Sequence, residues 1–203
     1  MVFSPLRFKI HPPKDVTAVI ASTVHLPCVA ESDLKTTITW TKDSKTALPM
    51  DSTVLLNGTL VLSDVKKSQQ GSYTCRATNA VKTIEAKVKI KPITIASCSV
   101  IRKYVSRVSG NYVIDPDGDG GLAQFTVFCD MIDKNGVGVT VISHDSEGRT
   151  KVRDIYYTGA SLSQLASLTR ASSHCEQIIA YGCYNSRLLI SGMGWWVSRD
   201  SSR

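Results

Sequence analysis

The chain has little of what catalysis commonly requires. Its 203 residues include four histidines, and aromatic residues make up only 7% of the sequence. No Gly-x-Ser-x-Gly motif, no His-Glu-x-x-His motif and no phosphate-binding glycine loop is present. We therefore expect a protein that is not an enzyme, with no catalytic residues and no cofactor.

The sequence also lacks the usual signals for a membrane or for nucleic acid. It has no run of about 18 apolar residues that could span a bilayer, and residues 1–5 begin no recognisable signal peptide. No basic run is interleaved with aromatic residues. We therefore expect no nucleic-acid partner, and a membrane connection only through a segment of a longer parent protein.

Six cysteines are present, and none forms a Cys-x-x-Cys pair. This pattern predicts three disulfides and an oxidising compartment. Six cysteines allow fifteen pairings, and the count alone does not distinguish them. Because the chain needs disulfides but shows no export signal, we expect it to be a fragment of a parent protein that continues beyond both ends.

Two clusters resemble metal sites only in part. His174, Cys175 and Cys183 lack a fourth ligand at a spacing usable for zinc. The Asp-x-Asp-x-Asp-Gly run of residues 115–120 resembles the start of a calcium loop, but Thr126 stands where that loop requires a glutamate. We expect the aspartates to form a turn and the chain to have no metal site.

The charge is uneven along the chain. Residues 1–92 contain thirteen Lys and Arg against seven Asp and Glu, a net charge of +6, whereas residues 93–203 contain eleven against ten, a net charge of +1. The basic first part can attract an acidic glycan such as heparan sulfate. We favour a simpler interpretation, in which lysines such as Lys87, Lys89 and Lys91 form the solvated face of a strand.

Alternating apolar residues predict β-strands in the first part of the chain. Asn57-Gly58 tolerates positive φ, so a hairpin is expected between residues 54–56 and 60–62. Residues 84–90 alternate regularly and predict a closing strand. The expected inward positions are Val24, Leu26, Cys28, Ile38, Trp40, Leu60, Leu62, Tyr73, Cys75, Ala77, Ile84, Ala86, Val88 and Ile90.

Trp40 follows Cys28 by twelve residues, and Tyr73 precedes Cys75 by two. This spacing resembles an immunoglobulin domain of the I-set, in which a disulfide joins two sheets, a tryptophan packs on it and a tyrosine hydroxyl fixes a corner. The resemblance implies a Cys28–Cys75 disulfide, with Trp40 and Tyr73 in the immunoglobulin core.

Two residues depart from the immunoglobulin pattern. Gln69 stands where an acidic residue is usual, so the customary ion pair with an arginine is absent. Lys82 stands where a glycine commonly follows the stretch of residues 77–79, so the final hairpin is expected to have a different shape. Neither departure changes the expected sandwich.

The sequence from Cys98 onward resembles the opening of a fibrinogen-like domain, and most of all the version found in contactin-associated proteins and their neurexin-IV relatives, which are cell-surface adhesion proteins. The family usually has Gly-Trp-Thr-Val where this chain has Gly-Val-Thr-Val at residues 138–141. The residues that carry the resemblance are 109–118, 125–131, 138–144, 174–177, 183–189 and 195–199.

The fibrinogen-like resemblance implies two further disulfides, Cys98–Cys129 and Cys175–Cys183. It also implies a first strand, a glycine-rich turn and a return strand whose residue Cys129 is bonded back to the first strand. The chain includes only part of such a domain, so no binding residues are carried over. Residues 194–199 are expected to form a further strand.

One helix is expected in the second part of the chain. Ser161 and Gln164 have the spacing of a capping box, and Leu162, Leu165 and Leu168 recur every three residues as far as Ala171. Residues 93–97, which contain no glycine, are the expected linker.

Asn57-Gly58-Thr59 is an N-glycosylation sequon at the tip of the predicted hairpin, so we expect Asn57 to carry a glycan. The alternative is an unmodified turn.

The expected protein is mainly β. An immunoglobulin-like sandwich (1–92) and a linker (93–97) are followed by an α+β partial fibrinogen-like domain (98–203). We expect an extracellular, secreted or cell-surface, module for recognition or adhesion. Its partner would be another cell-surface or matrix protein, or an acidic glycan. The alternatives are a structural component of the extracellular matrix and a secreted lectin-like protein that recognises glycans.

Overall fold

The computed structural model describes residues 4–44, 47–118, 120–145 and 155–177. The chain divides into two compact units, Met1–Ile95 and Ala96–Arg203. This division falls inside the expected linker, residues 93–97. Each unit is described by itself below.

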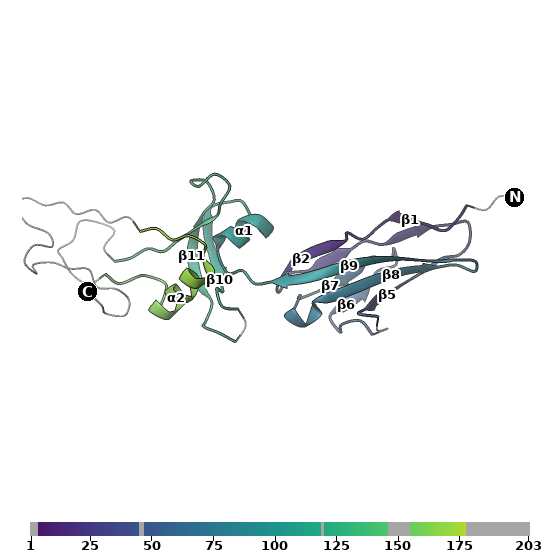
Figure 1. Ribbon diagram of the computed structural model, residues 1–203, viewed down its shortest axis with the longest axis horizontal. Helices are drawn as coiled ribbons and strands as arrows, with labels where there is room; N and C mark the ends of the chain where they lie inside the picture. The colour runs from purple at the N-terminus through teal and green to yellow at the C-terminus, as the bar shows by residue number, and fades with distance from the viewer. Residues whose placement is uncertain (1–3, 45–46, 119, 146–154, 178–203) are drawn as a thin grey trace, which may run out of the picture. The chain divides into compact units, whose positions relative to one another are not determined.

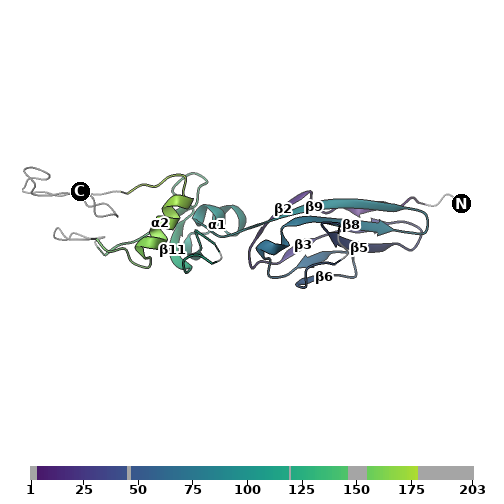
Figure 2. The same cartoon turned by 60° about the horizontal axis from the view of Figure 1, so that its bottom comes forward.

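The first unit is a two-layered β-sandwich. One sheet has the strand order β2-β9-β8-β5 and the other the order β3-β7-β6, while β1 and β4 pair separately. In Figure 2, β3 and β6 lie in one layer and β8 and β9 in the other. The strands are β1 (Arg7–Ile10), β2 (Asp15–Val19), β3 (Val24–Leu26), β4 (Val29–Glu31), β5 (Thr37–Lys42), β6 (Ser52–Val54), β7 (Leu60–Leu62), β8 (Gly71–Thr78) and β9 (Thr83–Ile93), with the short 3-10 helix η1 (Lys67–Gln69) before β8.

The core of this unit lies between the two sheets, where the alternation of the sequence places it. Leu26, Leu60 and Leu62 are fully buried on one sheet, and Tyr73 and Val88 are fully buried on the other. The intervening residues of β9, including Lys87, Lys89 and Lys91, are exposed. Because successive side chains of a strand point to opposite faces, one face of each sheet is apolar and the other is polar.

The predicted hairpin around Asn57-Gly58 is present, but its strands are shorter than expected. β6 and β7 pair antiparallel, with Val54 opposite Leu60. Leu55 and Leu56, expected in the strand, lie in the connecting turn, where the N–H of Gly58 donates to the carbonyl of Leu55 at 2.9 Å. Gly58 has φ of +86°, which is why a glycine suits this position.

The closing strand β9 is longer than predicted, because it continues through Pro92 to Ile93, the first residue of the expected linker. Its last residues pair with β2 in parallel, Ile93 opposite Val19. The hairpin from β8 to β9 is closed by Asn79, whose Oδ1 accepts hydrogen bonds from the N–H groups of Val81 and Lys82 at 3.0 and 2.8 Å.

The described part of the second unit combines a small sheet with the helices α1 and α2 (Figure 1). The sheet is antiparallel with the order β10-β11-β12. Phe125, Val127 and Cys129 are buried on one face of β11, and Ile114 of β10, which pairs with Phe125, is also buried. The elements are α1 (Cys98–Tyr104), β10 (Gly110–Ile114), β11 (Phe125–Asp130), β12 (Val139–Val141) and α2 (Leu162–Ala171).

One expectation for this unit is wrong. Cys129 was expected to be bonded back to a first strand, but its partner Cys98 is the first residue of helix α1. The buried residues of α1 are Cys98 and Ile101, three positions apart, which is the spacing of one helical face rather than of a strand. Arg102 and Lys103 lie in its last turn, where cations interact favourably with the helix dipole.

The predicted helix is α2, and its capping box is formed. The N–H of Gln164 donates to Ser161 Oγ at 3.2 Å, and the N–H of Ser161 donates to Gln164 Oε1 at 2.8 Å. Leu168 is buried, whereas Leu162 is exposed. The leucine stripe of α2 is therefore buried mainly at the C-terminal end of the helix, at Leu168.

Asp115 and Asp117, which follow β10, cap a turn, as predicted. Asp115 Oδ1 accepts from the N–H of Gly118 at 2.8 Å, and Asp117 Oδ2 accepts from the N–H of Leu122 at 3.0 Å. The strand predicted at residues 194–199 and the residue Cys183 lie outside the described residues.

Candidate recognition site

The centre of the first unit is fixed by the residues that the sequence singled out. Cys28, which follows β3, is bonded to Cys75 of β8, with a Cα–Cα distance of 6.6 Å, so the disulfide joins the two sheets. Trp40 lies opposite Cys75 on the neighbouring strand and is buried. Its indole Nε1 donates to the carbonyl of Gly58 at 2.8 Å, which ties the core to the β6–β7 turn.

Tyr73 fixes the start of β8. Its hydroxyl donates to the carbonyl of Gln69 at 2.9 Å, and the side chain is fully buried. Burial, and then the nearby Asp43 carboxylate, raise the pKa of Tyr73 to about 12. The hydroxyl therefore stays protonated, and remains a hydrogen-bond donor, at physiological pH.

The second unit has a disulfide between Cys98 and Cys129, with a Cα–Cα distance of 5.3 Å. Cys175 is exposed and has no disulfide partner among the described residues. Its predicted partner, Cys183, lies outside them. The Cys175–Cys183 pairing therefore stays a prediction.

The turn between β6 and β7 presents the predicted glycosylation site. Asn57 is exposed, and its Oδ1 accepts from the N–H of Thr59 at 3.0 Å, while Thr59 itself is buried. The same turn thus holds the Asn57 side chain at the surface and places the Gly58 carbonyl where it accepts from the Trp40 indole.

A groove of about 310 Å³ with both polar and apolar lining lies beside this turn. Its lining includes Val29, Ile38, Val54, Leu55 and Leu56. Leu56 is fully exposed, and Val54 and Leu55 are also exposed. An exposed apolar cluster next to a mostly polar surface is typical of a protein-contact site. The sequence does not indicate this cluster, because its apolar run favours a strand for these leucines.

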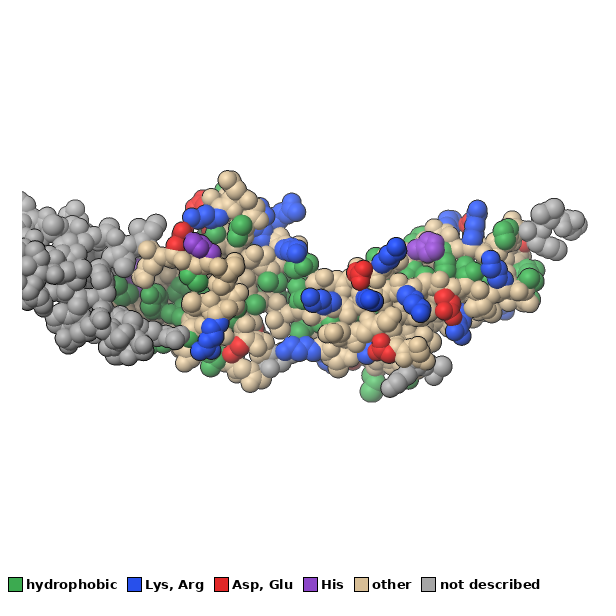
Figure 3. All heavy atoms as spheres, in the orientation of Figure 1, with side chains coloured by type: hydrophobic (Ala, Val, Ile, Leu, Met, Phe, Trp, Pro, Cys, Tyr) green, Lys and Arg blue, Asp and Glu red, His purple; other side chains and the backbone are tan. Residues whose placement is uncertain are grey.

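The positive charge of the first unit does not gather in one patch on the face drawn in Figure 3, where Lys and Arg side chains are interspersed with Asp and Glu. Ion pairs join several of these groups: Arg76 with Glu85 at 2.6 Å and Lys66 with Asp51 at 2.8 Å. This distribution agrees with solvated strand faces more than with a dedicated polyanion site.

Within the described parts of the chain, no group of three or more His, Cys, Asp or Glu residues is arranged to hold a metal ion. Of the helices described, none has both the length and the apolar character needed to cross a bilayer.

Within the described part of the chain, Gln69 is buried with an unpaired side-chain nitrogen, a feature that the sequence alone does not predict. The residue is 2% exposed, and its Nε2 has no hydrogen-bond partner among the residues that the structure describes. The available signal was its departure from the acidic residue usual at this position of an immunoglobulin domain.

Comparison with known proteins identifies the first unit. Residues 8–79 match the family pattern described as immunoglobulin domain. This part of the chain is therefore an immunoglobulin domain, in agreement with its two sheets, its Cys28–Cys75 disulfide and its buried Trp40.

The chain is also similar to Contactin-associated protein 1 of Rattus norvegicus, with 37% identity over 127 residues that cover 56% of this chain and 9% of that protein. For the Homo sapiens protein the identity is 36% over 126 residues, covering 55% and 9%. The chain thus spans less than a tenth of the length of these relatives. Because the matched part exceeds half of the chain, it is longer than the first unit, Met1–Ile95, and must include residues of the second.

Among solved structures, extracellular domains 3–5 of Drosophila OTK are 29% identical to this chain, with a TM-score of 0.41 and coverage of 44% of this chain and 32% of that chain. The fibrinogen-like character of the second unit stays a prediction.

Proposed function

We propose that this chain is an extracellular recognition or adhesion module that binds a protein partner and catalyses no reaction. The observation that carries the proposal is the similarity to Contactin-associated protein 1, which must include residues of the second unit. Two disulfides, one in each unit, support an oxidising and hence extracellular environment.

The surface of the immunoglobulin domain supports a protein partner. The groove beside the β6–β7 turn exposes Val54, Leu55 and Leu56, and apolar side chains of this kind form the buried centre of many protein interfaces. By its name, the relative associates with contactin. A cell-surface protein of the contactin type is therefore the first partner to test.

A glycan is the second candidate ligand, favoured by the net charge of +6 on residues 1–92. Electrostatic binding to a polyanion falls steeply as salt rises, whereas binding through apolar contacts does not. Salt dependence therefore separates the two candidates.

The experiment uses the full chain, secreted from eukaryotic cells with its disulfides intact and displayed as a multimer. Its binding is measured on cells with and without a surface contactin, before and after removal of heparan sulfate. We expect saturable binding that requires the surface protein and persists after glycan removal. A Leu56→Asp variant should weaken it, and Val81→Asp, a change at another exposed apolar residue away from the groove, should not. Absence of binding, or binding that depends only on heparan sulfate, would contradict the protein-partner proposal.

A further inference from the structure

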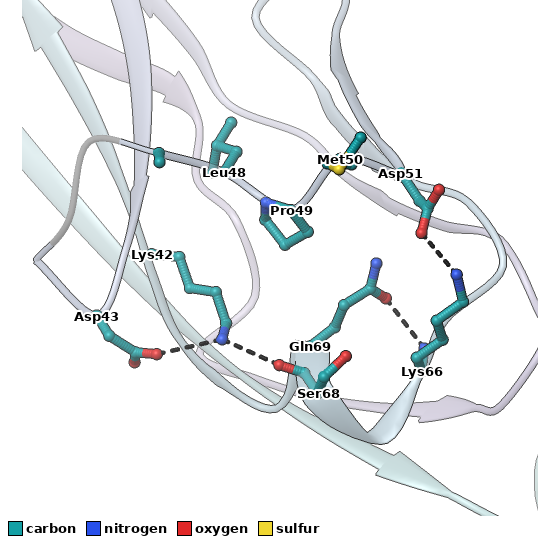
Figure 4. Close-up of a pocket in the computed structure, with 10 residues that line it drawn as sticks. Lys42, Asp43, Leu48, Pro49, Met50, Asp51, Lys66, Ser68 and Gln69 are labelled. Atoms are coloured by element: carbon teal, nitrogen blue, oxygen red, sulfur yellow. Dashed lines mark hydrogen bonds and ion pairs between the residues drawn. The ribbon is translucent and has the colours of Figure 1, made fainter.

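A second hollow, distinct from the groove beside Leu56, lies at the end of β5 in the immunoglobulin domain (Figure 4). It has a volume of about 480 Å³, within the range of sites that hold small ligands or single side chains. We call it the Gln69 hollow. Its lining includes Lys42, Leu48, Pro49, Met50, Lys66 and Gln69.

The amide of Gln69 has a fixed orientation. The main-chain N–H of Lys66 donates to Gln69 Oε1 at 3.1 Å, so the carbonyl end of the side chain faces the main chain before η1. The NH2 end must then point the other way, and in Figure 4 it is directed toward the segment that contains Pro49 and Met50. Exchanging the two ends would place an N–H against an N–H, so the hydrogen bond itself excludes the flipped amide.

This NH2 group is buried and has no acceptor within the described part of the chain. Buried polar groups in folded proteins are nearly always hydrogen-bonded, so each exception requires an explanation. The neighbouring lysines cannot satisfy it, because an ammonium group is a donor and has no acceptor lone pair. They donate instead, Lys42 Nζ to the carbonyl of Ser68 at 3.1 Å and Lys66 Nζ to Asp51 at 2.8 Å.

The charges around the hollow are already paired. Lys42 lies 3.4 Å from the carboxylate of Asp43, and Lys66 lies 2.8 Å from that of Asp51. An anionic or cationic ligand would have to break one of these pairs. A neutral hydrogen-bond acceptor would not, and it is what the NH2 group of Gln69 lacks.

The remaining wall is apolar. Leu48 packs partly against the domain core, and Pro49 and Met50 continue from it toward solvent. Met50 is fully exposed, so its side chain does not fill the hollow and is available as an apolar contact for a ligand there. Methionine is enriched at the centres of protein interfaces, which favours a peptide as the occupant.

We propose that the Gln69 hollow binds an uncharged amide carbonyl presented by a loop of a protein partner, with Gln69 Nε2 as the donor and Met50 as the apolar contact beside it. The proposal rests on the function proposed above and adds to it the chemical group that this surface recognises. No bond is made or broken in the interaction.

The test follows the side-chain NH2 signals of glutamines in nitrogen-proton correlation spectra of the full, disulfide-bonded chain. The probe is N-acetylalanine methylamide, a small peptide with two amide carbonyls. We expect the Gln69 signals and the Met50 methyl signal to shift together and to saturate. Gln70 is exposed, and Gln164 Nε2 already donates to the carbonyl of Ala123 at 2.6 Å, so the signals of both should stay unchanged.

Two variants test the role of the donor. Gln69→Glu keeps an oxygen for the N–H of Lys66 but removes the NH2 group, and we expect at least tenfold weaker probe binding, read from the Met50 methyl. Gln70→Glu adds the same charge one residue away and should leave binding unchanged. The titration of the unmodified chain decides the question even if Gln69→Glu fails to fold.

Several results would overturn the proposal. The first is the absence of a saturable shift at Gln69, and the second is an equal shift at Gln69 and Gln70. The third is a set of NH2 signals that show exchange contacts with a bound water only. Stronger binding of N-acetylglucosamine than of the peptide would also overturn it, because the acetamide would then be recognised on a sugar. Loss of cell-surface binding with an intact probe site would count against the proposed function alone.

Discussion

The hydroxyl of Tyr73 donates a hydrogen bond of 2.9 Å to the main-chain carbonyl of Gln69, four residues earlier. The two residues are almost completely buried. Gln69 therefore has its main chain fixed by the core, while its side chain forms the floor of the hollow at the end of β5. The Tyr73–Gln69 hydrogen bond thus also positions Gln69 Nε2. Among the described residues, this is the only buried side-chain polar atom without a hydrogen-bond partner.

The first prediction concerns this bond. Tyr73→Phe should lower the free energy of unfolding of the first unit by about 1–3 kcal/mol, because it leaves a buried carbonyl without its donor. Urea denaturation measures the change. Thr39→Val, which removes an exposed hydroxyl from β5 of the same unit, is the control. A loss for Tyr73→Phe no larger than that of the control would show that the bond contributes little to stability.

The second prediction is a loss of stability in alkali. The pKa of Tyr73 is raised from 10.0 to about 12 by burial and by Asp43, so the folded chain holds this proton more tightly than the unfolded chain does. The resulting stabilisation is fully present below pH 10 and is lost as the pH rises from about 10 to about 12. The melting temperature of the first unit should fall across this interval. Tyr73→Phe, which has no hydroxyl to ionise, should show a smaller fall, and equal slopes in the two proteins would refute the assignment.

The immunoglobulin domain could be predicted well because its constraints are local and repeated. The position of Trp40 after Cys28, and of Tyr73 before Cys75, leaves few ways to pair strands that alternate in and out. The structure accordingly places these four residues in one core. The chain turn at Asn57-Gly58 was also predictable, since Gly58 needs positive φ.

What could not be predicted depends on a few residues or on contacts between distant ones. The segment at Cys98 is only seven residues long as a helix, too short for its period to be distinguished from that of a strand. Leu55 and Leu56 continue the apolar run of Val54, but main-chain hydrogen bonds of the turn place them outside β6. The unpaired amide of Gln69 is visible only when the side chains of β5, the following loop and η1 are placed together.

The third prediction separates the backbone strain of replacing a glycine at positive φ from the steric clash of the added Cβ. Gly58 and Gly120 have nearly the same φ, +86° and +84°, but a Cβ at Gly58 would collide with the carbonyl of Cys28 and the side chain of Ile38, whereas one at Gly120 would meet nothing within 4 Å. Gly120→Ala should cost about 1–2 kcal/mol from backbone strain alone. Gly58→Ala should cost more, because the β6–β7 turn must also move away from Trp40. Chemical denaturation of the two units tests the order, and equal costs would show that the turn adjusts freely.

The fourth prediction is that Asn57 carries an N-linked glycan when the chain is secreted from eukaryotic cells. The residue is exposed on a turn, and it stands in an Asn-Gly-Thr sequon. Treatment with a glycosidase should increase electrophoretic mobility, and Asn57→Gln should remove the effect. Thr59→Ser keeps the sequon and should keep the glycan. A secreted chain whose mobility does not respond to the glycosidase would disprove occupancy.

The fifth prediction assigns the remaining cysteines, which we expect to form a Cys175–Cys183 disulfide. Trypsin should release both in one peptide, residues 171–187, because Arg170 and Arg187 bound it. Without reduction, that peptide should be lighter by two hydrogens than after reduction, and it should not react with a thiol reagent. Cys98 and Cys129 fall in different tryptic peptides and serve as the internal control, since their disulfide must link the two.

Loss of the short loop closed by Cys175 and Cys183 should cost about 2.5 kcal/mol, less than the roughly 4 kcal/mol of the longer Cys28–Cys75 loop. A free thiol in the peptide would leave Cys175 exposed and reactive, and would limit the disulfides of the chain to the two that the structure shows.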